Sequence, residues 1–138
     1  MKNSTNYYYK SFNLIFESKD IPLPELPKYH AKAIPNIIVK KEDPNSWKNQ
    51  ASIFYKSDYL TIYKNEVRLE IEEIGGFRVI NGNHIGWYQS KNENNNANLI
   101  KTYLLGSAIG ALLIQRNNLV LHGNSLTKDE RTIICLGQ

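Results

Sequence analysis

The sequence has 138 residues and a mass of 15.9 kDa, enough for one compact domain, or one small domain plus a fragment, but too short for a two-domain enzyme of ordinary size. Hydrophobic residues make up 41% and charged residues 22% of the chain, a balance that excludes collagen-like and disordered proteins. The 17 basic and 13 acidic residues are spread along the chain without a basic run, so we expect no nucleic-acid partner.

The sequence favours a cytoplasmic protein without a membrane segment. Its one cysteine, Cys135, has no partner for an internal disulfide and lies in the apolar run TIICLG, where we expect a small buried side chain. The first ten residues, MKNSTNYYYK, lack the apolar segment of a secretory signal. The longest apolar stretch, Leu99 to Ile114, carries Lys101 and is shorter than the ~18–20 residues that span a bilayer.

From Tyr7 to about Tyr88 the apolar residues alternate with polar ones, which predicts a β-rich region of six to eight short strands. The first strand is expected over KSFNLIFES, with Phe12, Leu14 and Phe16 on one face. The three prolines of IPLPELP predict an extended connector or edge segment over Ile21 to Pro27.

Further strands are predicted after this connector. The dipeptide Asn81-Gly82 tolerates positive φ and favours a hairpin between its two flanking strands. The predicted segments are Asn36–Lys40, Ser52–Lys56, Asp58–Tyr63, Val67–Ile71, Phe77–Ile80 and His84–Tyr88.

The pattern changes after residue 90. Residues 91–98 (KNENNNAN) are polar and low in complexity, which predicts a linker. Residues 99–114 are apolar on most sides and predict a buried helix, with Asn98 as its N-cap and Asn117-Asn118 at its end. This organisation predicts a β-rich domain over 7–90, the linker 91–98, and the start of a second domain over 99–138.

Two short buried strands, Leu119–His122 and Thr132–Leu136, are predicted after the helix, joined by a polar turn from Asn124 to Arg131. A continuous apolar strand such as IICL is typical of a sheet covered on both faces, which requires more helices than this chain supplies. A strand followed directly by glycine is also how a P-loop, G-x-x-x-x-G-K-[ST], begins, so Gly137 and Gln138 fit its first two positions.

Several segments together resemble, in order and spacing, the N-terminal part of the HPr kinase-like proteins. They are SFNLIFESKDIPLPELP, GGFRVINGNHI, LIKTYLLGSAIGALLIQRNNLVLHGNSL and TIICLGQ, and the resemblance extends from about Phe12 to Gln138. In that family a β-rich leader precedes an apolar helix, a strand beginning with histidine and glycine, and a strand that runs into the P-loop. The resemblance implies an α+β fold in which the β-rich domain is followed by a buried helix and the first strands of an incomplete P-loop kinase domain.

The resemblance implies an ATP- and Mg²⁺-dependent serine kinase that acts on a protein or peptide. Gly137 would be the first glycine of the P-loop, and His122 matches the family's histidine before the P-loop strand. The P-loop lysine, the Mg²⁺-binding hydroxyl and the acidic residues would all follow Gln138. We therefore expect a truncated kinase that neither binds ATP nor catalyses phosphoryl transfer alone, and that self-associates or meets a partner completing the kinase domain.

Two other interpretations bear on the function. His30, His84 and His122 lack the spacing of metal ligands, so we expect no metal site. For His122, a structural role is more common than a role in the nucleotide site. The alternative to the kinase interpretation is a stand-alone, non-catalytic β-rich module that binds or regulates a partner.

Overall fold

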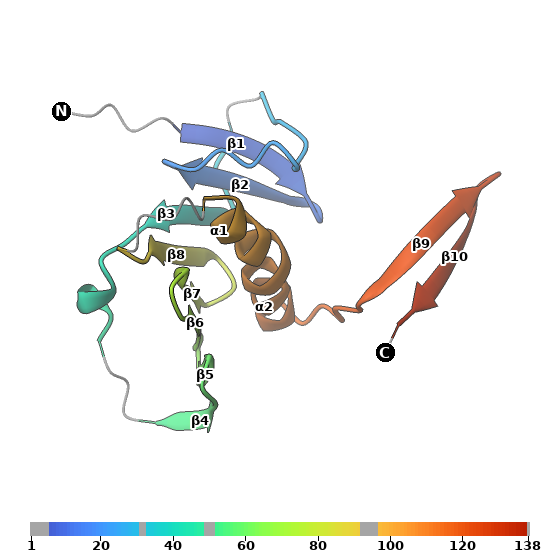
Figure 1. Cartoon of the computed structure of the whole chain (residues 1–138). Helices are drawn as coiled ribbons and strands as arrows, with labels where there is room; N and C mark the ends of the chain where they lie inside the picture. The colour runs from blue at the N-terminus through green and yellow to red at the C-terminus, as the bar shows by residue number, and fades with distance from the viewer. Residues whose placement is uncertain (1–5, 31–32, 49–51, 92–96, 138) are drawn as a thin grey trace.

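The computed structural model describes residues 6–30, 33–48, 52–91 and 97–137 and has a mixed, β-rich α+β architecture. One eight-stranded sheet is covered on one face by a helix, and a separate two-stranded hairpin follows (Figure 1). The strands of the sheet are β1 (Asn6–Ser11), β2 (Leu14–Lys19), β3 (Ile37–Lys41), β4 (Ile53–Lys56), β5 (Leu60–Tyr63), β6 (Glu66–Ile71), β7 (Gly75–Ile80) and β8 (His84–Gln89). A 3₁₀ turn, Pro44–Ser46, follows β3.

The strand order, β1-β2-β3-β8-β7-β6-β5-β4, joins two antiparallel groups through one inserted strand. β1 and β2 form a hairpin, and β4 to β8 form an antiparallel meander. β3 pairs in parallel with β2 on one side and with β8 on the other. The predicted region of six to eight strands is thus confirmed as a single sheet of eight.

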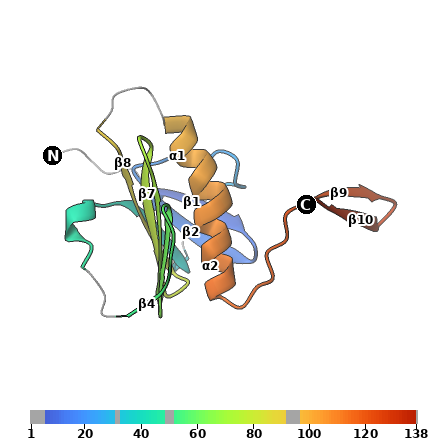
Figure 2. The same cartoon turned by 60° about the horizontal axis from the view of Figure 1, so that its bottom comes forward.

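The helix consists of α1 (Ala97–Tyr103), a π-helical segment over Leu104–Ala108, and α2 (Ile109–Gln115). It crosses the face of the sheet, where it contacts β7 (Figure 2). Its inner face carries Ile100, Leu104, Ala108, Ile109 and Leu112, all at most 2% exposed. The helix therefore closes the hydrophobic core instead of starting a separate one.

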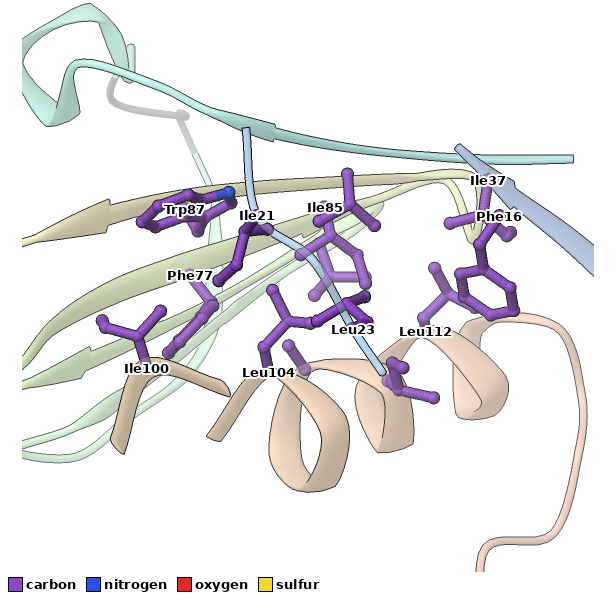
Figure 3. Close-up of a cluster of buried hydrophobic side chains, with 14 of the residues drawn as sticks. Phe16, Ile21, Leu23, Ile37, Phe77, Ile85, Trp87, Ile100, Leu104 and Leu112 are labelled. Carbon is purple, nitrogen blue, oxygen red and sulfur yellow. The ribbon is translucent and has the colours of Figure 1, made fainter. Parts of the chain in front are cut away.

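The facing strands supply the other half of this core because their side chains alternate between the two faces of the sheet. On β7, Phe77 and Val79 point toward the helix and are fully buried, whereas Arg78 points to the opposite face. Figure 3 shows Phe77 and Ile85 opposite Ile100 and Leu104 in this layer. Burying such side chains contributes roughly 1.5–3 kcal/mol each.

The proline-rich segment 21–27 contributes to the core although it forms no strand. Ile21 and Leu23 are 6% and 0% exposed and lie over the sheet beside the helix (Figure 3). The Leu23 amide donates to the Tyr9 hydroxyl at 2.8 Å. Pro27 and Tyr29 bond to the outer edge of β1, so this connector also covers that edge.

One predicted strand is interrupted. Phe12 and Asn13 have φ angles of 52° and 58°, and they form a two-residue turn between β1 and β2. The prediction of a continuous strand over KSFNLIFES was wrong because primed two-residue turns match the twist of a hairpin, and this requirement outweighs the alternation. Phe12 is consequently 56% exposed and does not join the core.

The hairpin predicted at Asn81-Gly82 is confirmed. Asn81 and Gly82 have φ angles of 52° and 63° between β7 and β8. A Cβ added to Gly82 would lie 2.8 Å from the Arg116 side chain, and Arg116 donates to the Gly82 carbonyl at 2.9 Å. The turn is thereby attached to the end of the helix.

The helix differs from its prediction at its start and in its burial. It begins at Ala97, so Asn98 lies inside the first turn and is not the N-cap. Its end is as predicted, since Asn117 has a φ of 61° and the Asn118 amide donates to the Leu113 carbonyl. Residues 92–96 of the predicted linker lie outside the described residues.

The helix is buried on one face only, with Ile114 61% exposed, so the prediction of burial on most sides was wrong. Among the described residues, the sheet and the proline-rich segment pack on its inner face, and its outer face is left exposed. With 19 residues the helix is long and apolar enough by length and composition to cross a membrane, so the prediction of a stretch too short to do so was wrong; here its inner face packs on the sheet.

The C-terminal hairpin, β9 (Gly123–Lys128) and β10 (Arg131–Leu136), extends away from the body (Figures 1 and 2). The predicted strand Thr132–Leu136 is confirmed as part of β10, but Leu119–His122 forms no strand. The predicted turn from Asn124 to Arg131 is shorter in the structure, with only Asp129 and Glu130 between the two strands. All residues of both strands are exposed, Cys135 included, so the prediction of buried strands and a buried cysteine was wrong. β10 is apolar as expected, whereas β9 is mostly polar, and no described element covers either strand.

We expect a chain that ends after Asn118 to keep the fold and the free energy of unfolding of the whole chain, because the hairpin adds no residue to the core. Urea unfolding followed by the fluorescence of Trp47 and Trp87 measures this. As a control, Leu112→Ala in the shortened chain should cost roughly 2–5 kcal/mol. A loss of cooperative unfolding on removal of the hairpin would contradict the self-contained core.

Candidate functional site

The two predicted site residues, His122 and Gly137, lie at the open end of the C-terminal hairpin. The last paired residues are Gly123 and Leu136. One step further in the same register would oppose His122 to Gly137, although neither belongs to a strand. The fold thus brings the ends of β9 and β10 together at the predicted site.

Gly137 is exposed, and a Cβ added to it would meet nothing within 4 Å. A phosphate cradle requires several converging backbone amides, usually ahead of a helix. The described residues supply no helix after Gly137. Among the described residues, the exposed Gly137 stands at the point where the motif would begin.

His122 also contributes to an apolar groove between one side of the helix and strands β5 and β6. The cavity has a volume of about 780 Å³. The sheet lines it with Leu60, Ile62, Val67 and Leu69, and the helix lines it with Tyr103, Gly106, Gly110, Ala111 and Ile114. Val120 and His122 close one end.

Two glycines give the groove its depth. A Cβ on Gly106 would meet nothing within 4 Å, and one on Gly110 would meet only Val120, at 3.9 Å. Because no side chain fills this strip of the helix, another backbone can approach it closely. The few polar groups in the lining, such as Ser107 and Lys64, do not form a catalytic arrangement.

A second site lies on the opposite face of the sheet, centred on Glu42. Its Oε2 accepts hydrogen bonds from Trp47 Nε1 at 3.0 Å and from Arg78 Nε at 2.9 Å. Its Oε1 lies 2.9 Å from His84 Nε2 and 3.4 Å from Lys40 Nζ. We call Glu42, Trp47, Arg78 and His84 the Glu42 cluster.

Burial by itself would raise the pKa of the Glu42 carboxyl group. The hydrogen bond to His84 and the positive charge of Arg78 outweigh burial and hold this pKa below the ordinary value of 4.5. The side chain is only 6% exposed, and both oxygens are engaged. A carboxylate held in this way is a structural anion, since neither oxygen is free to accept a proton from a substrate.

Arginine and aromatic side chains extend this layer. Trp47 packs edge-on against Tyr88 with ring centroids 5.3 Å apart, and Arg78 lies 5.5 Å from the Trp47 ring. Arg68 lies 4.9 Å from the Tyr63 ring and pairs with Glu66. The outer face of the sheet is thus covered by paired charges and aromatic rings.

A glycine makes room for the cluster. A Cβ added to Gly86 on β8 would lie 2.2 Å from Glu42 Oε2, so only glycine lets the carboxylate rest on the strand. The sequence analysis missed Glu42 and Arg78. The available signal was a glycine inside a strand (HIGWY) and an arginine at an outward position of another (GGFRV), neither of which identifies a partner far away in the chain.

The remaining candidates are dispersed. His84 binds Glu42, His30 lies beside Tyr7 and Tyr29, and His122 lies in the groove. Within the described parts of the chain, no three His, Cys, Asp or Glu side chains gather as metal ligands would.

Comparison of the chain with protein-family models, with curated proteins and with solved structures found no match.

We expect Glu42→Gln to lower the free energy of unfolding by roughly 3 kcal/mol at pH 7, because it leaves Arg78 without its buried counter-charge. The matched control Glu72→Gln, at an exposed position, should change it by less than about 0.5 kcal/mol. Urea unfolding at pH 7 measures both, and equal effects would contradict a structural role for Glu42.

The difference between wild type and Glu42→Gln should also depend on pH. The pKa of Glu42 is lower in the folded than in the unfolded state. The ionised carboxylate therefore stabilises the fold fully at a pH above the ordinary pKa of 4.5, and this stabilisation is lost as the pH falls through the folded-state pKa. Unfolding curves between pH 7 and pH 3 should therefore converge at low pH. A difference that grows on acidification would have the wrong sign.

Proposed function

We propose that this chain is the N-terminal part of an HPr kinase-like, ATP-dependent serine kinase that acts on a protein or peptide and is not catalytic by itself. One observation carries the proposal: strand β10 of the C-terminal hairpin has apolar side chains on both faces, and no described element covers it. Ile133 and Ile134 point to opposite faces and are 66% and 60% exposed. A strand with two apolar faces is typical of the interior of an α/β sheet.

The hairpin also needs neighbours in order to be stable. Two-stranded hairpins are marginal in water unless further strands or a helix pack on them. Additional strands and helices of a kinase domain would supply this cover, and the sequence resemblance indicates which domain they belong to. The groove between the helix and β5–β6 offers a second apolar surface to the same domain.

ATP and Mg²⁺ would bind only in the completed protein. The 138 residues contain no full G-x-x-x-x-G-K-[ST] motif, and Gly137 contributes one exposed backbone amide. In the completed site Gly137 would begin the phosphate-binding loop, with His122 opposite it. Phosphoryl transfer depends on positioning and charge neutralisation, so a chain without the P-loop lysine and hydroxyl lacks the catalyst.

The second candidate is a non-catalytic β-rich module that binds or regulates a partner. Its support is the self-contained core, which the sheet, the proline-rich segment and the helix complete without the hairpin. In this case the hairpin would be an appendage that contacts the partner. In either case the exposed thiol of Cys135 is suited to a reducing compartment, and we propose a cytoplasmic location.

We expect the isolated chain to show no saturable binding of Mg-ATP by titration calorimetry. Reading the three frames of DNA after codon 138 for S-G-x-G-K-[ST] tests the proposal directly. A chain extended through that motif and its following helices should bind Mg-ATP, and changing the motif lysine to alanine should abolish binding.

Two outcomes would refute the kinase proposal in favour of the binding module. One is saturable Mg-ATP binding by the 138-residue chain. The other is the absence of the motif from all three frames.

A further inference from the structure

We infer that the C-terminal hairpin of one copy packs into the apolar groove of a second copy, so that two chains exchange hairpins. The contacting face of the hairpin carries Leu126, Ile133 and Cys135. The receiving surface is the groove between the helix and strands β5 and β6. This inference concerns the 138 residues alone and does not depend on the kinase proposal.

The exposed surface is larger than that of a compact monomer. The chain exposes 10098 Å², whereas a compact protein of 15.9 kDa exposes about 7,400 Å². The excess of about 2,700 Å² is above the roughly 800 Å² per partner that a standard interface buries. Association can therefore remove enough surface for a stable dimer.

The C-terminal hairpin contributes apolar side chains to this exposed surface. Leu126 and Ile133 form a cross-strand pair and are 73% and 66% exposed. Cys135 shares their face because side chains alternate along β10. The opposite face carries Ile134 and Leu136 beside the bonded hydroxyls of Thr127 and Thr132.

The groove suits such a face. Gly106 and Gly110 leave a strip of the helix bare, so the side chains of a hairpin can reach its backbone. Ile114, 61% exposed, borders this strip. Lys128 and Arg131 pair at the turn end of this same face of the hairpin, and the turn residues Asp129 and Glu130 beside them balance their charge.

The path of the chain favours exchange over closure within one copy. Val120 and His122 line one end of the groove, and the chain leaves it at Gly123 with the hairpin pointing away from the body (Figures 1 and 2). For the hairpin to pack into the groove of its own copy, the chain would have to reverse its direction within a few residues of Gly123. A second copy related by a two-fold axis receives it without one.

Sedimentation equilibrium of the whole chain tests the exchange with matched variants. Wild type should form a dimer, and Ile133→Asp should raise the dimer dissociation constant by about 100-fold. The adjacent Ile134→Asp, on the other face, should raise it by less than about 5-fold. Equal effects of the two changes would overturn the inference. So would a wild type that stays monomeric over a roughly 100-fold range of protein concentration up to its solubility limit.

The groove has its own pair of variants. Ile114→Asp should weaken the dimer as strongly as Ile133→Asp. Ile34→Asp, at a position 90% exposed and outside the groove, should not. Since all four side chains are mostly exposed, folding should be unaffected, and circular dichroism checks this.

A disulfide distinguishes exchange from closure. Cys135 is the only cysteine, so Ser107→Cys places one new thiol in the groove. Mild oxidation should give a covalent dimer on a non-reducing gel, and Cys135→Ser in the same chain should prevent it. An oxidised monomer without free thiols would show the hairpin in its own groove and overturn the inference, as would the absence of any cross-link.

Discussion

The packing of one helix face against one sheet face is the contact on which the rest of the structure depends. Ile100, Leu104 and Leu112 fill the space over Phe77 and Ile85, and all five are at most 1% exposed. The proline-rich segment closes the same layer from the side. Because this layer holds strands from both antiparallel groups, it also fixes the position of the surfaces around it: the groove outside the helix and the charged layer behind the sheet.

Local sequence signals predicted most of the strands and the helix, because alternation and turn chemistry act over a few residues. Asn81-Gly82 gave its hairpin for this reason. Phe12-Asn13 did not, since a phenylalanine with positive φ is uncommon and the apolar pattern runs through it. Burial was the weaker part of the prediction. The apolar run Ile133–Leu136 indicates a surface that needs cover, but composition does not say that the cover belongs to the same 138 residues.

The candidate sites also differed in whether the sequence alone could identify them. Gly137 and His122 could be singled out because a motif and a resemblance act along the chain. The Glu42 cluster could not, since Glu42, Arg78 and His84 meet only through the parallel pairing of β3 with β8. Its role also differs from what a group of titratable residues suggests, because every donor around the carboxylate is already engaged. The two faces of the sheet thus hold different chemistry, with apolar packing on one side and paired charges on the other.

The insertion of β3 between β2 and β8 has a consequence for how the chain reaches this state. Ile38 pairs with His84 and Phe16 with Ile37, so the middle of the sheet joins segments made early and late in synthesis. Loop closure must precede any gain from such pairs, which slows folding. During synthesis, the edge of β3 that pairs with β8 has no partner until the segment after Asn81-Gly82 has left the ribosome. An unpaired strand edge can pair with another chain, so this topology leaves β3 open to incorrect pairing until β8 has been made.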